Sequence, residues 1–230
     1  IGCRSLGSRL TGAEAVDFIR AALDLGLTFF DTADVYSAGE SERLLGRAVA
    51  GDRDRCVIAT KFRHHSSQRG ASRKSIRLAL EGSLRRVGVD YIDLLQLHGP
   101  DPATPIEETI MTLQDLVQEG KILYFGLCNM SAWQVVEAQY IAWAGTRVPL
   151  ASLQVKINAV DHSQLSELRL IAGRFKVGLL AASPLARGLL GGSYDRRNPP
   201  HAGHPLLSNK GVEYWDERGF AAVERVRAAA

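Results

Sequence analysis

Short apolar runs alternate with amphipathic segments along most of the chain. The predicted strands lie near residues 27–31, 56–60, 91–97, 122–127, 150–155 and 177–182. Most of these runs are continuously apolar rather than alternating, which indicates strands buried on both faces of a parallel sheet. The intervening segments have helical periodicity, and several end at a glycine such as Gly26, Gly51 or Gly88. The pattern predicts a repeated βα fold.

Capping signals mark the starts of several predicted helices. Thr11 and Glu14 have the spacing of a capping box, and so have Ser131 and Gln134. Ser72 is expected to cap a third helix, and Pro105 is expected at the first position of a fourth. The predicted helices cover about 11–26, 40–50, 72–88, 104–120, 131–144, 163–173 and 212–226.

Two architectures suit such repeats, an open doubly wound sheet and a closed (β/α)8 barrel. A doubly wound nucleotide-binding sheet requires a glycine-rich phosphate loop, but the chain contains neither GxGxxG nor GxxxxGK[ST]. A barrel instead predicts polar side chains at the carboxyl ends of successive strands. Such residues are present at or near these ends: Asp31, Lys61, His98, Asn129, Gln154 and Ser183. The sequence therefore predicts an α/β fold of the (β/α)8 TIM barrel type.

The length of the chain bears on this prediction. With a strand remnant at residues 1–3, the 230 residues supply seven βα units. A seven-stranded arc would leave unpaired strand edges. We therefore expect residues 1–230 to form a single barrel domain that is incomplete at its C-terminal end, with the eighth βα unit missing.

Composition and charge exclude several classes of function. The 28 basic and 25 acidic residues give a net charge of +3 without a basic block, so neither nucleic acid nor a membrane surface is an expected partner. No apolar run approaches the ~20 residues of a membrane span, and no signal peptide is recognisable. The three cysteines form no CxxC motif. A cytoplasmic protein without a metal site is expected.

Four residues at the predicted barrel mouth have complementary chemistry: Asp31, Tyr36, Lys61 and His98. The pKa of a free tyrosine is near 10, and a neighbouring ammonium is expected to lower it, while a carboxylate holds the ammonium in place. A histidine can polarise a carbonyl oxygen by hydrogen bonding. These groups suit proton donation during carbonyl reduction. None supplies a hydride, so a cofactor is expected.

The same residues lie in segments that resemble the aldo-keto reductase superfamily. The similar segments span nearly the whole chain: 29–36 (FFDTADVY), 39–42, 45–46, 58–62, 83–101, 119–122, 126–129 and 183–188. The resemblance implies NADPH-dependent reduction of a small aldehyde or ketone in a (β/α)8 barrel. NADH is left open, because the segment that reads the 2′-phosphate would lie in the missing part.

The resemblance also implies roles for individual residues. Tyr36 would be the general acid, with Lys61 and Asp31 tuning it, and His98 would orient the carbonyl group. The cofactor contacts would come from Asn129 and Gln154 at the carboxamide and from Ser183, Leu185 and Gly188 along the pyrophosphate loop. Cys128 stands where the family usually has a serine at the carboxamide, and Ala182 stands where an aromatic ring usually stacks on the nicotinamide.

Two other functions are compatible with these residues. One is a cofactor-binding regulatory barrel subunit with little turnover, which the changes at Cys128 and Ala182 keep open. The other is a Schiff-base enzyme using Lys61, which would leave Tyr36 and Asp31 without a role. The sequence identifies neither the carbonyl substrate nor the oligomeric state. A homo-oligomer is one of the possible states.

Overall fold

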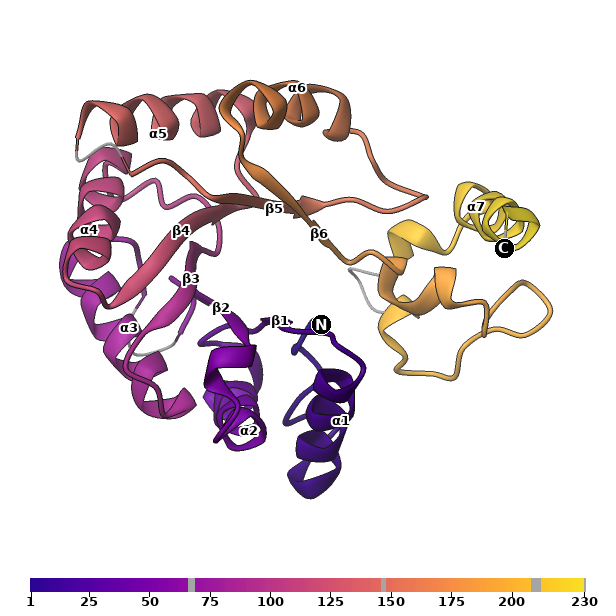
Figure 1. The fold of residues 1–230 in the computed structure, drawn as a ribbon. Coiled ribbons are helices and arrows are strands. Elements are labelled where there is room, and N and C mark those ends of the chain that lie inside the picture. Colours follow the sequence, from indigo (N-terminus) through magenta and orange to yellow (C-terminus); the bar gives the residue numbers. More distant parts are fainter. Residues whose placement is uncertain (66–68, 146–147, 208–211, 230) are drawn as a thin grey trace. The chain divides into compact units, whose positions relative to one another are not determined.

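The computed structural model describes residues 1–65, 69–145, 148–207 and 212–229 (Figure 1). Six strands alternate with the helices in these residues. The elements are α1 (Gly12–Asp24), β1 (Phe29–Asp31), α2 (Glu40–Val49), β2 (Val57–Phe62), α3 (Arg73–Val87), β3 (Ile92–Leu97), α4 (Ile106–Gln118), β4 (Ile122–Cys128), α5 (Ala132–Ala144), β5 (Ser152–Lys156), α6 (Leu165–Phe175), β6 (Gly178–Ala182) and α7 (Glu217–Ala229). The 3-10 helices are η1 (Tyr36–Gly39), η2 (Arg53–Arg55), η3 (Ala186–Gly191), η4 (Pro205–Leu207) and η5 (Val212–Tyr214).

The chain divides into two compact units, Ile1–Leu153 and Gln154–Ala230. In the first unit, strands β1 to β4 are parallel and neighbour one another in chain order. The register pairs Phe30 with Ile58 and Lys61 with Gln96. Gly2 forms a parallel bridge to Asp31, as predicted for a strand remnant at the N-terminus. The predicted order of βα repeats is therefore confirmed in this unit.

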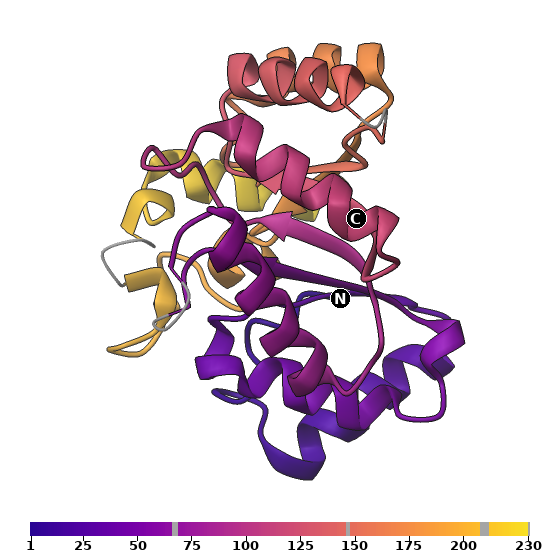
Figure 2. The ribbon, with the colours of Figure 1, turned by 90° about the vertical axis from the view of Figure 1, so that its left-hand side faces the viewer.

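Helices α2, α3 and α4 lie along one side of strands β1 to β4 (Figures 1 and 2). Every residue of β3 is buried, which agrees with the largely apolar sequence of that strand. Large buried side chains such as Phe30, Ile58 and Phe125 fill the space around the strands. This packing holds the carboxyl ends of β1 to β4 in fixed relative positions.

Glycine is required where α2 meets α3. A Cβ atom built on Gly46 would lie 2.0 Å from the carbonyl oxygen of Val87, so a larger residue would force the helices apart. The close approach brings Arg86 of α3 to the buried carboxylate of Glu42 in α2, with 2.5 Å between Nε and Oε2. The hydroxyl of Thr60 in β2 donates to the other oxygen of Glu42 at 2.7 Å. A polar network thus joins α2, α3 and β2.

The helix starts confirm two of the capping predictions and correct two. Ser131 and Gln134 form a complete capping box, and the hydroxyl of Ser72 accepts a hydrogen bond from the backbone N–H of Ser75. Thr11 makes no side-chain capping bond, so that prediction was wrong. Its neighbour Gly12 has φ +52, outside the right-handed helical region, which disturbs the first turn. Pro105 precedes α4 as its N-cap instead of occupying its first position.

The second unit has its own small core. The backbone N–H of Ile157, just after β5, donates to the carbonyl of Ala182 in β6 at 3.3 Å. The apolar cluster of this unit consists of Ala186, Leu189, Leu206, Tyr214 and Val223. The predicted last helix at 212–226 is found as η5 followed by α7, which begins only at Glu217. The unit therefore continues the alternation of strands and helices.

Candidate active site

A buried ion pair joins the ends of β1 and β2. The Lys61 side chain is fully buried, and its Nζ donates to both carboxylate oxygens of Asp31, at 2.8 and 2.7 Å, and to the carbonyl of Thr32 at 2.8 Å. These three acceptors match the three N–H donors of an ammonium group. Burial lowers the pKa of Lys61, but the neighbouring Asp31 and Tyr36 outweigh it and leave the pKa raised. Lys61 therefore carries a fixed positive charge.

Gln96 on the neighbouring strand β3 is hydrogen-bonded to this ion pair. The sequence alone did not identify Gln96 as a site residue. It is fully buried in β3, and its Nε2 donates to Asp31 Oδ1 at 3.1 Å. Its Oε1 accepts from the Cys128 thiol, with 3.6 Å between sulfur and oxygen. The available signal was an uncharged polar residue inside the largely apolar run 91–97. A buried polar side chain needs such partners, so Gln96 locks the orientation of Asp31.

Tyr36 lies beside this pair in the turn that follows β1. Its ring centroid is 5.2 Å from Lys61 Nζ and 5.8 Å from the ring centroid of His98, with 78° between the ring planes. The turn is held because Ser37 has φ +49 and its hydroxyl donates to the carbonyl of Leu6 at 2.8 Å. The sequence-predicted residues Asp31, Tyr36, Lys61 and His98 are thus brought together in the first unit.

The pKa of Tyr36 differs from the sequence-based expectation. Burial raises its pKa above the usual value, and the opposing influence of Lys61 does not cancel this. Lys61 does lower the pKa of Tyr36, as the sequence predicts, but the predicted net lowering is wrong because desolvation of the phenolate is the larger effect. The phenol is consequently protonated at neutral pH and available as a proton donor.

His98 follows β3 and presents a neutral imidazole. Burial lowers its pKa to about 3, with further contributions from Lys61 and His64. Its Nδ1 is buried and has no hydrogen-bond partner among the described residues. Its backbone carbonyl accepts from Asn129 Nδ2 at 3.0 Å. Asn129 itself has φ +56 and an exposed side chain at the end of β4.

The predicted cofactor residues are divided between the two units. In the first unit, Cys128 is fully buried behind Gln96, whereas Asn129 is exposed. Burial raises the pKa of the Cys128 thiol to about 12, so the group stays protonated.

The other predicted cofactor residues belong to the second unit. Gln154 lies in β5, while Ser183, Leu185 and Gly188 lie in one loop after β6. In this loop Ser183, Ala186 and Arg187 all have positive φ. Arg187 Nε is buried without a hydrogen-bond partner in the described part of the chain.

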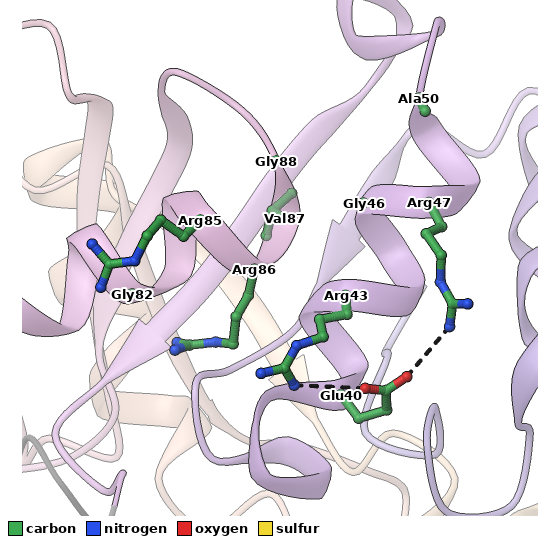
Figure 3. A pocket seen from close by; sticks show the side chains of 10 residues that line it. All are labelled: Glu40, Arg43, Gly46, Arg47, Ala50, Gly82, Arg85, Arg86, Val87 and Gly88. Carbon is green, nitrogen blue, oxygen red and sulfur yellow. Dashed lines mark hydrogen bonds and ion pairs between the residues drawn. The ribbon is translucent and has the colours of Figure 1, made fainter.

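A groove of the first unit is lined by other residues. It has a volume of about 870 Å³ and lies between α2 and α3 (Figure 3). Its charged lining residues are Glu40, Arg43, Arg47, Arg85 and Arg86. Glu40 pairs with Arg43 and Arg47, so part of the positive charge is already neutralised. None of the predicted site residues lines this groove.

In the described residues, no helix has both the length and the apolar character needed to cross a bilayer. Among the same residues, no three histidine, cysteine or acidic side chains are grouped as metal ligands.

The parallel βα repeat and its polar strand ends define a protein of the (β/α) barrel class. A family model described as "Aldo/keto reductase family" matches residues 1–228, and the chain belongs to this family. The chain spans between 59% and 66% of the lengths of four curated relatives. One of these, the "Probable voltage-gated potassium channel subunit beta" of Oryza sativa subsp. japonica, is 34% identical over 212 residues, which are 89% of this chain and 65% of the relative.

Two solved structures show the same fold. The glycerol dehydrogenase AKR11B4 from Gluconobacter oxydans superposes with a TM-score of 0.78 at 32% identity, covering 94% of this chain and 69% of that one. An aldo/keto reductase from Klebsiella pneumoniae, in complex with NADP and acetate, gives a TM-score of 0.66 at 31% identity, covering 76% and 59%. The predicted α/β fold class, a (β/α)8 barrel, is thereby confirmed.

Proposed function

We propose that the protein is an NADPH-dependent carbonyl reductase in which Tyr36 protonates the substrate oxygen. The observation that carries the proposal is the position of Tyr36 between a buried, Asp31-bound ammonium and a neutral imidazole. The family membership and the NADP complex of the Klebsiella pneumoniae relative support it. The substrate would be a small aldehyde or ketone.

Each of the four side chains at the site has its own role in the proposed reaction. The Tyr36 hydroxyl donates its proton to the carbonyl oxygen, and Lys61 stabilises the phenolate left behind. Asp31 holds Lys61 in position. Because His98 is neutral, one ring nitrogen carries a hydrogen that can be donated to the same carbonyl oxygen. All four charges and dipoles are in place before the substrate arrives, which lowers the cost of reorganisation.

The residues present fit the proposed cofactor. NADPH would supply the hydride that the protein side chains lack. The exposed Asn129 side chain offers an amide to the nicotinamide carboxamide, and Gln154 would do so from β5. In the loop 183–188, the unpartnered Arg187 Nε suits an anionic pyrophosphate. The contacts proposed for Cys128, Ser183, Leu185 and Gly188, and the preference for NADPH over NADH, belong to the same proposal.

Replacement of Tyr36 by phenylalanine tests this function. We expect NADPH consumption with 4-nitrobenzaldehyde to fall by about 100-fold or more in kcat, because the general acid is lost. The dissociation constant of NADPH, measured by fluorescence quenching, should change little. Tyr91→Phe is the matched control, because Tyr91 precedes β3 and so lies at its opposite end from His98. Full activity of Tyr36→Phe would contradict the proposal.

A regulatory barrel subunit is the second candidate, favoured by the name of the rice relative. It would bind NADPH, show negligible reductase turnover and purify with a larger complex. Turnover that depends on Tyr36 decides against it.

The proposal also covers where the protein is located and what it binds. We expect a cytoplasmic protein, since all three cysteines are free and buried. Nucleic acid is not an expected partner, and the oligomeric state can be measured by light scattering.

A further inference from the structure

Two arginines beside Tyr36 and His98 have no carboxylate partner in the described residues. Arg4 Cζ lies 5.8 Å from the ring centroid of Tyr36. Arg63 Nη1 lies 2.9 Å from Nε2 of His64, whose ring centroid is 5.1 Å from that of His98. Two half-buried arginines elsewhere in this unit behave differently: Arg53 and Arg86 are paired with Asp93 and Glu42.

Arg63 is held in a backbone conformation that favours glycine. It directly follows β2 and has φ +111, far from the regions that side-chain-bearing residues normally adopt. Its carbonyl accepts from the N–H of Gly70 at 3.1 Å. Its Nε is buried and has no hydrogen-bond partner in the described ranges. Such strain in a site region points to a functional reason for the side chain.

The charges that face the site are predominantly positive. Besides Lys61, the groups Arg4, Arg63 and His64 all act on His98 and lower its pKa in addition to the effect of burial. Two of the nearby carboxylates are already engaged. Asp31 is bound by Lys61, while Asp101 accepts hydrogen bonds from Thr104 and from the backbone N–H groups of Ala71 and Ala103. An anion placed beside Tyr36 would therefore meet mainly cations, because burial raises the pKa of the third carboxyl group, Asp34, to about 7.

We propose that Arg4 and Arg63 recognise an anionic group on the substrate, so that the preferred carbonyl compound carries a carboxylate or a phosphate. A guanidinium group binds either anion through two parallel hydrogen bonds. This substrate class rests on the proposed reductase function. Tyr36 and His98 would contact the carbonyl oxygen at one end, and the two arginines would hold the anion at the other.

Matched aldehydes test the inference. The purified protein is assayed with NADPH and 4-carboxybenzaldehyde, 4-formylphenyl phosphate and the uncharged methyl 4-formylbenzoate. We expect a KM at least about tenfold lower for an anionic aldehyde than for the ester, as one charged hydrogen-bonded contact typically provides. The first two substrates distinguish carboxylate from phosphate.

Arg63→Gly is the decisive variant, because glycine adopts a φ of +111 without strain. It should melt at least as high as the wild type, yet raise the KM for the anionic aldehyde about tenfold and change the KM for the ester much less. Arg4→Gln should act in the same direction. Arg85→Gln is the control, since it removes an equal charge from the remote α2–α3 groove.

The outcomes separate this inference from the reductase function. Equal KM values for the ester and the anionic aldehydes, with no change in Arg63→Gly, would overturn the anion site. The reductase function would still stand if turnover depends on Tyr36. If no aldehyde is reduced, the reductase function fails, and calorimetric titration with 4-(hydroxymethyl)benzoate still tests the anion site. Binding that is equally strong in the wild type and in Arg63→Gly would then overturn it.

Discussion

The ring of Tyr36 stands edge-on to the imidazole of His98, with 5.8 Å between the centroids. Tyr36 follows β1 and His98 follows β3, while Lys61 lies on β2, the strand between them. The relative position of the two rings therefore depends on the register of three strands. The charged Nζ of Lys61 lies 5.2 Å from the ring centroid of Tyr36. That charge is the first feature to test by mutation.

Asp31→Asn should destabilise the protein and abolish turnover. Lys61 is fully buried, and losing the Asp31 carboxylate leaves its ammonium without a counter-charge. The expected loss in free energy of unfolding is roughly 3–5 kcal/mol, measured by urea denaturation. The double variant Asp31→Asn/Lys61→Met should recover part of the stability but none of the reductase activity. An Asp31→Asn protein as stable as the wild type would show that the pair contributes little.

Asp34 makes the protein less stable as the pH rises. It is fully buried, neither carboxylate oxygen has a hydrogen-bond partner in the described residues, and burial together with Glu42 raises its pKa from 3.8 to about 7. Nearby Arg86 and the backbone N–H groups of Val35 and His65 lower the pKa and offset only part of this rise. Between pH 4 and 7 the unfolded chain releases this proton while the folded protein keeps it, so stability falls with rising pH.

Asp34→Asn should remove this pH dependence. The variant is expected to be more stable than the wild type by a margin that grows between pH 4 and pH 8, as measured by chemical denaturation at each pH. Asp17→Asn, on an exposed face of α1, is the control for loss of one negative charge. A margin that is constant with pH would mean that Asp34 is ionised in the folded protein at all these values.

Gly46→Ala should disrupt the contact between α2 and α3. The added Cβ would lie 2.0 Å from the backbone carbonyl oxygen of Val87, which cannot rotate away. We expect a loss of about 1–3 kcal/mol in unfolding free energy. Gly173→Ala in α6 meets no atom within 4 Å and should instead stabilise its helix by up to about 1 kcal/mol. Similar effects of both substitutions would contradict the close packing at Gly46.

Ser131→Ala should cost about 1 kcal/mol, because it removes the capping box that begins α5 directly after Asn129 and Met130. Thr11→Ala provides the comparison, since the Thr11 side chain makes no capping bond. Its effect should stay within about 0.5 kcal/mol. Thermal unfolding of both variants measures the difference, and equal losses would argue against a special role for the Ser131 cap.

Local patterns predicted most of the fold. The largely apolar run at 91–97 predicted β3, and the serine and glutamine spacing at Ser131 and Gln134 predicted the start of α5. The family resemblance brought Asp31, Tyr36, Lys61 and His98 together before the structure did. Thr11 shows where local signals fail: its capping spacing is present, but the φ of +52 at Gly12 alters the first turn.

The sequence by itself determined the βα repeat and the four reactive side chains, because periodicity and residue type are properties of the chain alone. Only the tertiary structure shows that Gln96 donates to Asp31, that the pKa of Tyr36 is raised and that Arg63 has a positive φ. Desolvation and hydrogen bonding depend on groups that are distant in sequence. The ammonium of Lys61 lowers the pKa of Tyr36 and burial raises it, so the net direction follows only from the extent of burial.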